Sequence, residues 1–442
     1  MSRRIDSRRS TLALILTLST IALVIAAQAR AADSNSADVA RTPVAGSANP
    51  DGIEALVAEA MRQSPLIAAA RSHWRAQEKV PIQVSTLPDP EIALQHFTVG
   101  SPQPFSGYET SDFYYTGFGA TQEIPGPGKL GLRAKQAHKD ADYARAAYEV
   151  AQRSVAEKVR EACFNLFYLD KAAALLRENR VELQRIERVT EEGYRVGRGI
   201  QQDVTKAQLQ MTAILREIEM NRDQIDEQQA ELKAIVGREI DSHEIQIGEL
   251  KPSQFDLDAT RIRSLVAAES PDLRMALAMS ARSSDSLELA RRDYWPDFSL
   301  GYMYQKTGPG ARDYYMLSLG AKVPLYFWRK QKPAVEQAAL EKEAAIDQVR
   351  AARLEADSGV QRQIVAIRTA NRIIALYRDG LIPQSTATRA AASSAYSSGK
   401  ADFQTLLSAV IDVLNLNQEY YRAIADREIA IAKLKQIIGD QS

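Results

Sequence analysis

An internal duplication with a period of about 200 residues restricts the fold of this chain more than any other feature. The segment YRVGRGIQQDV at residues 194–204 returns as YSSGKADFQTL at residues 396–406. In the same order, LPDPEIALQHF at 87–97 returns as YWPDFSLGYMY at 294–304, and FGATQEIPGPGK at 118–129 as LGAKVPLYFWRK at 319–330. We therefore expect two copies of one structural unit that complete each other's packing.

Long helical hairpins are predicted in each copy. The first copy has no proline between residues 129 and 195, which allows a helix of about 60 residues and about 90 Å. Apolar residues in this region recur at alternating steps of four and three, a pattern typical of coiled coils. We predict a first repeat over 51–250, with strands at about 91–99 and 112–123 and helices at about 129–195 and 201–237, and a second repeat over 251–442, with strands at about 297–306 and 312–323 and helices at about 330–397 and 402–438.

The predicted strands alternate in character. Phe298, Leu300, Tyr302 and Tyr304 lie on one face of their strand, whereas the intervening residues are small, polar or methionine. Tyrosine and tryptophan residues also cluster near the strand ends. This pattern fits strands that face lipid, with the aromatic residues at the membrane interface. It fits equally well the packing of a small soluble sheet.

Residues 1–31 have the pattern of an export signal: a basic start, an apolar core and small residues that allow cleavage after Ala29 or Ala31. An uncleaved membrane anchor is the alternative. Residues 32–50 are small and polar, which predicts a flexible lead-in. Beyond the signal there is no apolar run of about 18 residues, so any later contact with a bilayer has to be made by strands.

The composition argues against several classes of function. Lys plus Arg equals Asp plus Glu at 56 each, so the chain lacks the net charge that favours nucleic-acid binding. The single cysteine, Cys163, excludes an intramolecular disulfide, and the four scattered histidines suggest no metal site. We predict no metal, no cofactor and no enzymatic activity, because no constellation of nucleophile, base or metal ligands is present.

The duplicated segment is predicted to be the tip of a hairpin. Gly197 and Gly199 break the helical pattern, and Asp203 is placed to cap or favour the next helix. Gly399, Lys400 and Asp402 form the matching tip. The two hairpins should project in the same direction from two pairs of strands. Four strands cannot close a sheet in lipid, so the chain would need copies of itself.

The chain resembles the TolC-like outer-membrane efflux proteins over nearly the whole expected mature chain, from about residue 52 to residue 439. The resemblance rests on the duplication, the LPDPE and WPDFSLG strand starts, the QEIPGPGKLGLRAKQA and KVPLYFWRKQKPAVEQA passages, and the Tyr-x-x-Gly tips. It implies a mainly α fold with a small β part. It further implies a homotrimer in the outer membrane of a Gram-negative bacterium, with a twelve-stranded barrel and a helical tunnel through the periplasm. The implied partners are a periplasmic adaptor and an inner-membrane pump of the RND type.

The resemblance also implies that the tips surround the closed end of the tunnel. Well-known family members carry two aspartates on the second tip, one turn apart, where this sequence has Thr405 and Ser408. Asp402, or Asp203 on the first tip, would have to supply charge instead. The LPDPEIAL segment and the lack of a lipid-modified cysteine look more like the heavy-metal cation branch than the lipid-anchored drug-efflux branch. A soluble periplasmic coiled-coil adaptor or scaffold is the alternative function.

Overall fold

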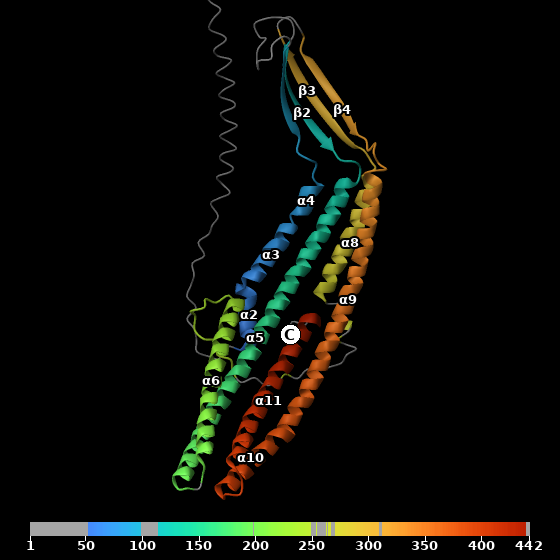
Figure 1. Cartoon of the computed structure of the whole chain (residues 1–442). Coiled ribbons are helices and arrows are strands. Elements are labelled where there is room, and N and C mark those ends of the chain that lie inside the picture. Colours follow the sequence, from blue (N-terminus) through green and yellow to red (C-terminus); the bar gives the residue numbers. More distant parts are fainter. Residues whose placement is uncertain are drawn as a thin grey trace, which may run out of the picture. The chain divides into compact units, whose positions relative to one another are not determined.

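The computed structural model describes residues 52–98, 114–197, 199–248, 253, 262, 264–266, 270–308 and 312–438. The expected signal peptide at 1–31 and the expected lead-in at 32–50 lie outside these residues. Most of the described chain is helical, and one small sheet completes it (Figure 1). The predicted fold class, mainly α with a small β part and long hairpins, is therefore confirmed.

The first hairpin consists of α5 (Lys129–Arg195) and α6 (Gln201–Val236). With 67 residues, α5 extends for about 100 Å at 1.5 Å per residue. The apolar residues at steps of four and three face the interior: Val155, Val159, Ala162, Leu166 and Leu169 are all buried. All but Leu169 pack against α2 and the end of α6 in one continuous cluster.

The second hairpin differs from the prediction of one helix over 330–397. It contains α9 (Gln331–Leu376), a π-helical turn η1 (Tyr377–Leu381), α10 (Ile382–Ser397) and, after the tip, α11 (Phe403–Ile438). Pro383 explains the interruption, because proline has no N–H for the regular helical hydrogen bond and its ring crowds the preceding turn.

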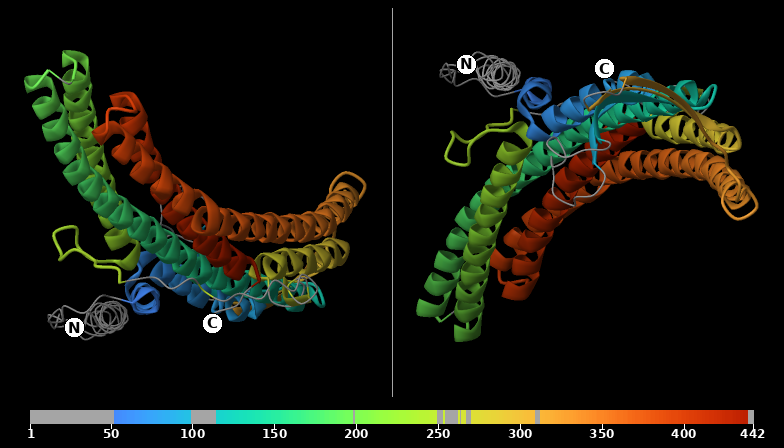
Figure 2. Two further views of the ribbon diagram at one scale, coloured as in Figure 1. Left: turned by 90° about the horizontal axis from the view of Figure 1, so that it is seen from below. Right: turned by 90° about the horizontal axis from the view of Figure 1, so that it is seen from above.

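Shorter helices pack against these hairpins: α2 (Ile53–Gln63), α3 (Pro65–Gln77), α4 (Val80–Ser85) and α8 (Pro271–Arg292). Pro65 and Pro271 occupy the first turns of α3 and α8, as expected for a residue whose missing N–H has no helical partner there. Helices α2, α3, α4 and α8 all contact α5, and α8 also contacts α9. In both views of Figure 2, α11 lies between α5 and α9, and it contacts both.

The sheet is an antiparallel meander in the order β1-β2-β3-β4. Its strands are β1 (Glu91–Thr98), β2 (Tyr114–Ile124), β3 (Asp297–Thr307) and β4 (Tyr314–Lys322). The inner pairing joins the two repeats, since β2 belongs to the first and β3 to the second. Figure 1 shows the sheet at one end of the helices and the two hairpin tips at the other.

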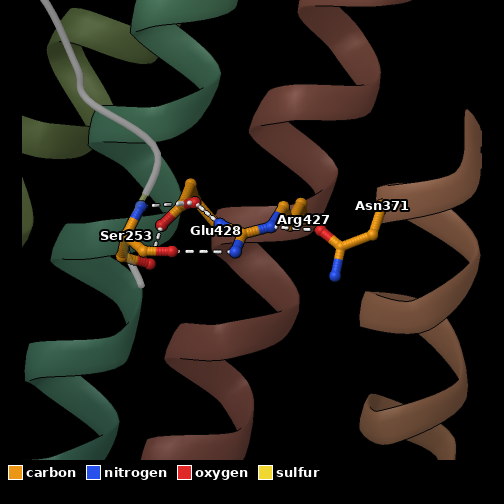
Figure 3. A network of polar contacts seen from close by, with 4 residues as sticks. All are labelled: Ser253, Asn371, Arg427 and Glu428. Atoms are coloured by element: carbon orange, nitrogen blue, oxygen red, sulfur yellow. Dashed lines mark hydrogen bonds and ion pairs between the residues drawn. The ribbon is translucent and has the colours of Figure 1, made fainter. Parts of the chain in front are cut away.

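A buried polar network ties the connection between the repeats to the second hairpin. Arg427 of α11 donates to the carbonyl oxygen of Ser253 (2.8 Å) and to Oδ1 of Asn371 in α9 (2.6 Å), and it pairs with Glu428. Glu428 in turn accepts hydrogen bonds from the backbone N–H and the hydroxyl of Ser253 (Figure 3). Arg427 and Glu428 are both buried, so each compensates the desolvated charge of the other.

Candidate functional site

The first hairpin tip turns at a glycine with positive φ. Gly197 has φ of 74°, a conformation that side chains with a Cβ rarely adopt. Its N–H donates to the carbonyl oxygen of Tyr194 (3.0 Å), and the N–H of Gly199 donates to the carbonyl oxygen of Gly193 (3.1 Å). These bonds satisfy carbonyls that the end of α5 would otherwise leave open.

The second tip repeats this geometry. Gly399 has φ of 69°, and its N–H donates to the carbonyl oxygen of Tyr396 (3.0 Å). The N–H of Lys400 donates to the carbonyl oxygen of Ala395 (2.8 Å). The duplicated sequence thus specifies the same left-handed helix end twice, with glycine at the position that requires it.

The helices that leave the two tips begin differently. In α11, the Asp402 carboxylate accepts a hydrogen bond from the Thr405 N–H (2.8 Å) and another from the Thr405 hydroxyl, which is the geometry of an N-cap. The Thr405 hydroxyl, its N–H and the Lys206 charge lower the pKa of Asp402 below its usual range. In α6 the N-cap residue is Ile200, without a side-chain cap, and Asp203 lies in the first turn. Asp203 therefore does not cap the helix, although a carboxylate there favours it through the helix dipole.

The structure places the tip residues as follows. Ser408 donates its hydroxyl to the carbonyl oxygen of Thr405 (3.1 Å), so Asp402, Thr405 and Ser408 form one exposed polar row at the start of α11. Gly197, Gly399 and Lys400 are exposed, whereas Gly199 and Asp203 are half-buried.

The sequence patterns did not predict the residues that join the two hairpins near their tips. Phe403 is 2% exposed and lies in an apolar cluster contributed by α5, α6, α10 and α11. Nearby, Lys206 of α6 donates to Oε1 of Gln404 in α11 (3.3 Å). The sequence signal that could have indicated the burial of Phe403 was an aromatic residue directly after a helix-capping aspartate. The Lys206 contact depends on how the hairpins lie side by side, which no local pattern reports.

The strand register gathers the apolar side chains on one face of the sheet. Leu300 pairs with Gln122 and Leu319, and Tyr302 with Ala120 and Leu317. Residues directly opposite each other point to the same face. The resulting apolar face consists of Ile92, Leu94, Phe118, Ala120, Ile124, Phe298, Leu300, Tyr302, Tyr304, Tyr315, Leu317, Leu319 and Ala321, interrupted by His96, Thr116, Gln122 and Lys306.

This apolar face is open to its surroundings. Leu319 is 79% exposed, Ile92 and Leu94 are each 68% exposed, and Leu317 is 67% exposed. Exposed apolar surface of this extent marks contact with a partner or a membrane. His96 lies on this face as an exception, and its Nδ1 is 3.1 Å from the Thr116 hydroxyl.

The opposite face carries small residues because the strands crowd there. A Cβ added at Gly119 would lie 2.7 Å from the carbonyl oxygen of Tyr302, and one at Gly320 would lie 2.4 Å from the Ser299 hydroxyl oxygen. Glycine at these positions permits the close approach of neighbouring strands. The alternation predicted for β3 is observed in that strand, whereas the opposite face of the sheet also carries the stacked rings of Phe97 and Tyr115.

Two cavities lie among the helices. One, of about 190 Å³, is lined by α2, α5 and α11 and includes Glu54 and Glu157. The other, of about 490 Å³, lies between α10 and α11. The part of the chain described by the structure has no group of three His, Cys, Asp or Glu residues arranged to bind a metal ion. None of its helices combines the length and apolar character needed to cross a membrane.

Comparison with known proteins places this geometry in a family. The sequence profile of a family described as outer membrane efflux protein matches residues 56–238 and 262–440. The structure is similar to VceC, an outer membrane protein of Vibrio cholerae, with 16% identity, a TM-score of 0.75 and coverage of 88% of this chain and 96% of that one. It is also similar to the outer membrane channel CmeC of Campylobacter jejuni, with 15% identity, a TM-score of 0.76 and coverage of 91% and 90%.

The outer membrane channel MtrE of Neisseria gonorrhoeae is a third similar structure, with 18% identity, a TM-score of 0.68 and coverage of 88% and 89%. At these identities the likeness shows the fold alone. A search of curated proteins found no match.

Proposed function

The chain belongs to the outer membrane efflux protein family, and from this premise we propose that it is the exit duct of a tripartite efflux system. The family consists of efflux channels rather than enzymes, and the resemblance to TolC-like proteins is confirmed at this level. The proposal assigns the chain to the outer membrane of a Gram-negative bacterium, after export by its signal peptide. In this role the protein conducts substrates passively from a pump and an adaptor to the outside.

The exposed apolar face of the sheet is the observation that carries this proposal. In lipid, every backbone N–H and C=O needs a partner, yet the outer edges of β1 and β4 are unpaired among the described strands. Copies that join β4 of one chain to β1 of the next satisfy both edges. Three copies supply twelve strands and close the sheet, and the apolar face is then turned toward lipid. The same three copies bring the long hairpins together as a tunnel.

At the far end of the tunnel, the hairpin tips form the aperture. Its proposed residues are Gly197, Gly199, Asp203, Gly399, Lys400, Asp402, Thr405 and Ser408. Hydroxyl groups at Thr405 and Ser408 do not select ions by charge as a ring of carboxylates does. Asp402 uses its carboxylate as a helix cap, which supports an aperture that leaves selection of the cargo to the pump.

The proposed partners are a periplasmic adaptor, an RND-type pump and the lipid of the outer membrane. Heavy-metal cations are the proposed cargo, in line with the strand-start sequence LPDPEIAL. A soluble adaptor or scaffold would have to cover the apolar face of the sheet with another protein, because exposed surface of this kind is unfavourable in water.

Membrane fractionation and particle mass test the proposal together. The mature protein should fractionate with outer membranes, and light scattering with detergent correction should give the mass of about three chains. Addition to a planar bilayer should produce steps of ion conductance, and a deletion strain should become sensitive to metal ions. A water-soluble monomer without conductance would contradict the duct. Sensitivity to drugs but not to metal ions would contradict only the proposed cargo.

A further inference from the structure

A polar clasp holds the two repeats together at the base of the sheet. Lys129, only 4% exposed, donates through Nζ to Oδ1 of Asp297 (2.8 Å) and to the carbonyl oxygen of Trp295 (3.0 Å). The Lys129 Nζ also lies 3.4 Å from Oδ1 of Asp293. The clasp therefore links the first residue of α5 in one repeat to the first residue of β3 in the other.

The duplication provides a second set of the same residues. Lys129 lies eight positions before the buried Ala137, and Lys330 lies eight positions before the buried Ala338. Asp297 follows Pro296 at the start of β3, and Asp89 follows Pro88 just before β1. Lys330 and Asp89 thus correspond to Lys129 and Asp297.

This second pair is not joined within the chain. Lys330 and Asp89 are both exposed, and neither makes an ion pair with another described residue. Lys330 follows β4 and Asp89 precedes β1, the two outer strands of the sheet. These strands are separated by three strand spacings, or about 14 Å. The two halves of the second clasp therefore lie at opposite edges.

We propose that the Lys330 ammonium of one copy binds the carboxylate of Asp89 of the partner subunit, so that the clasp is repeated between copies. The inference rests on the proposed function, because it requires β4 of one copy to pair with β1 of the next. Such a head-to-tail contact uses two different surfaces of the chain and generates a ring when the rotation closes.

The two sheet edges are compatible with this pairing. Leu317 and Leu319 of β4 lie on the same sheet face as Ile92 and Leu94 of β1. Pairing these strands with matching faces continues the apolar face from one copy to the next. The β2–β3 pairing, which the Lys129 clasp accompanies, has the same arrangement.

The turn that precedes Lys129 and the turn that precedes Lys330 differ in length and sequence. In the first turn, a Cβ at Gly126 would lie 2.8 Å from the carbonyl oxygen of Pro296, and the Gly126 N–H donates to Oδ1 of Asp297 (2.7 Å). The second turn has two more residues between its proline, Pro324, and its lysine, and it carries exposed aromatic side chains. The proposed contact between copies therefore includes the lysine–aspartate pair but has no counterpart of the hydrogen bond from the Gly126 N–H.

The basic residues at this turn do not stabilise the helix that follows them. Lys330 and Lys332 stand at the start of α9, which has no acidic residue in its first turn. Positive charge at the start of a helix opposes the helix dipole. An anionic partner outside the helix would stabilise the exposed Lys330, as Asp297 stabilises Lys129.

Charge reversal tests this pair in the full mature protein in detergent. Lys330→Asp and Asp89→Lys should each lower the temperature at which the oligomer dissociates by about 1–3 °C, because each replaces an attraction by a repulsion. The double variant should recover most of this loss because it restores the attraction with the signs exchanged. Lys332→Asp, Glu91→Lys and their double variant are the controls, since these residues are exposed near the same positions and should show no such recovery.

Chemical cross-linking provides a second readout that does not depend on stability. In a Cys163→Ala background, the Lys330→Cys/Asp89→Cys variant treated with a short bifunctional thiol reagent should give covalent dimers and trimers on a denaturing gel. The matched Lys129→Cys/Asp297→Cys variant should cross-link within one chain and remain at the monomer position.

The outcomes separate this inference from the proposed function. A wild-type particle with the mass of one chain would overturn the oligomeric duct itself. An intact oligomer in which Lys330→Cys/Asp89→Cys gives only monomers, or in which charge reversal has the same effect as the controls, would overturn the clasp and leave the duct in place.

Discussion

At the scale of single residues, Glu157 is a buried carboxylate whose pKa is raised by its surroundings. It is 7% exposed and lies in α5, beside Lys158 and Glu161 and facing Lys433 of α11. Burial raises its pKa to about 7, with a further contribution from the neighbouring Glu161. Lys433 and Lys158 act in the opposite direction, and Lys433 is also engaged by Glu161 at 2.8 Å.

We predict that Glu157 makes the protein less stable as the pH rises. The folded state holds a proton that the unfolded state releases, so stability falls between the ordinary pKa of 4.5 and the raised value of about 7. After allowance for solvent screening, the loss should be about 1–2 kcal/mol. Glu157→Gln should remove most of this loss when the apparent unfolding temperature is compared at pH 5 and pH 8.

Glu178→Gln is the matched control for this experiment. Glu178 is exposed on the same helix, so its replacement should leave the pH dependence of the unfolding temperature as in the wild type. An equal pH dependence in Glu157→Gln and the wild type would refute the assignment to Glu157.

At the scale of elements, each hairpin tip depends on one left-handed glycine. Alanine at Gly197 or Gly399 would have to adopt φ of about 70°, at a cost of about 1 kcal/mol. We predict that Gly399→Ala impairs export while the oligomer still assembles, because the strain is confined to the tip. Efflux in a complemented deletion strain and particle mass in detergent are the two measurements.

Gly193→Ala is a suitable control for the tip. Gly193 belongs to α5, and a Cβ there meets no atom within 4 Å, so alanine should favour the helix. Normal export by Gly399→Ala would remove the tip geometry from the mechanism. Impaired assembly would instead assign the tip a structural role.

The sheet provides a second prediction at this scale. Tyr302 lies on the apolar face of β3 and Met303 on the opposite face. Arginine at Tyr302 should oppose insertion by about 2–4 kcal/mol if this face meets the middle of the bilayer. Immunoblots of outer-membrane fractions should therefore show less Tyr302→Arg than Met303→Arg. Equal amounts of the two variants would be incompatible with a lipid-facing Tyr302.

At the scale of the whole molecule, the Arg427 network joins the segment at Ser253, between the two repeats, to α9 and α11 of the second hairpin. Arg427→Ala would leave the Glu428 carboxylate, 5% exposed, without its cationic partner. We predict a loss of about 3–5 kcal/mol, because an isolated buried charge is strongly destabilising. The apparent unfolding temperature of the purified protein measures this effect.

A double variant distinguishes loss of charge pairing from loss of packing. Arg427→Met/Glu428→Leu removes both charges and keeps apolar volume, so it should be markedly more stable than Arg427→Ala. If the single and double variants unfold at the same temperature, the ion pair is not what holds Ser253 and Asn371 against α11.

Local patterns in the sequence predicted many of the elements of this fold. A 3.5-residue period predicted the long helices, two-residue alternation predicted the faces of β3, and glycine punctuation predicted the tips at Gly197 and Gly399. These signals act between neighbours in the chain, so they can be read without the fold. The π-helical turn before Pro383 was missed, because a proline within a helical pattern leaves the local adjustment undetermined.

The sequence by itself determined the duplication, the helices and strands of each repeat, and the chemistry of their exposed faces. Only the tertiary structure decided which strands pair, that Asp402 caps its helix while Asp203 does not, and that Lys129 reaches Asp297. The pair Lys129 and Asp297 is separated by 168 residues, so its contact depends on how α5 and β3 are placed by all the intervening packing. Periodicity reports which face of an element is buried, whereas the position of one element against another is set by side chains that interlock across the fold.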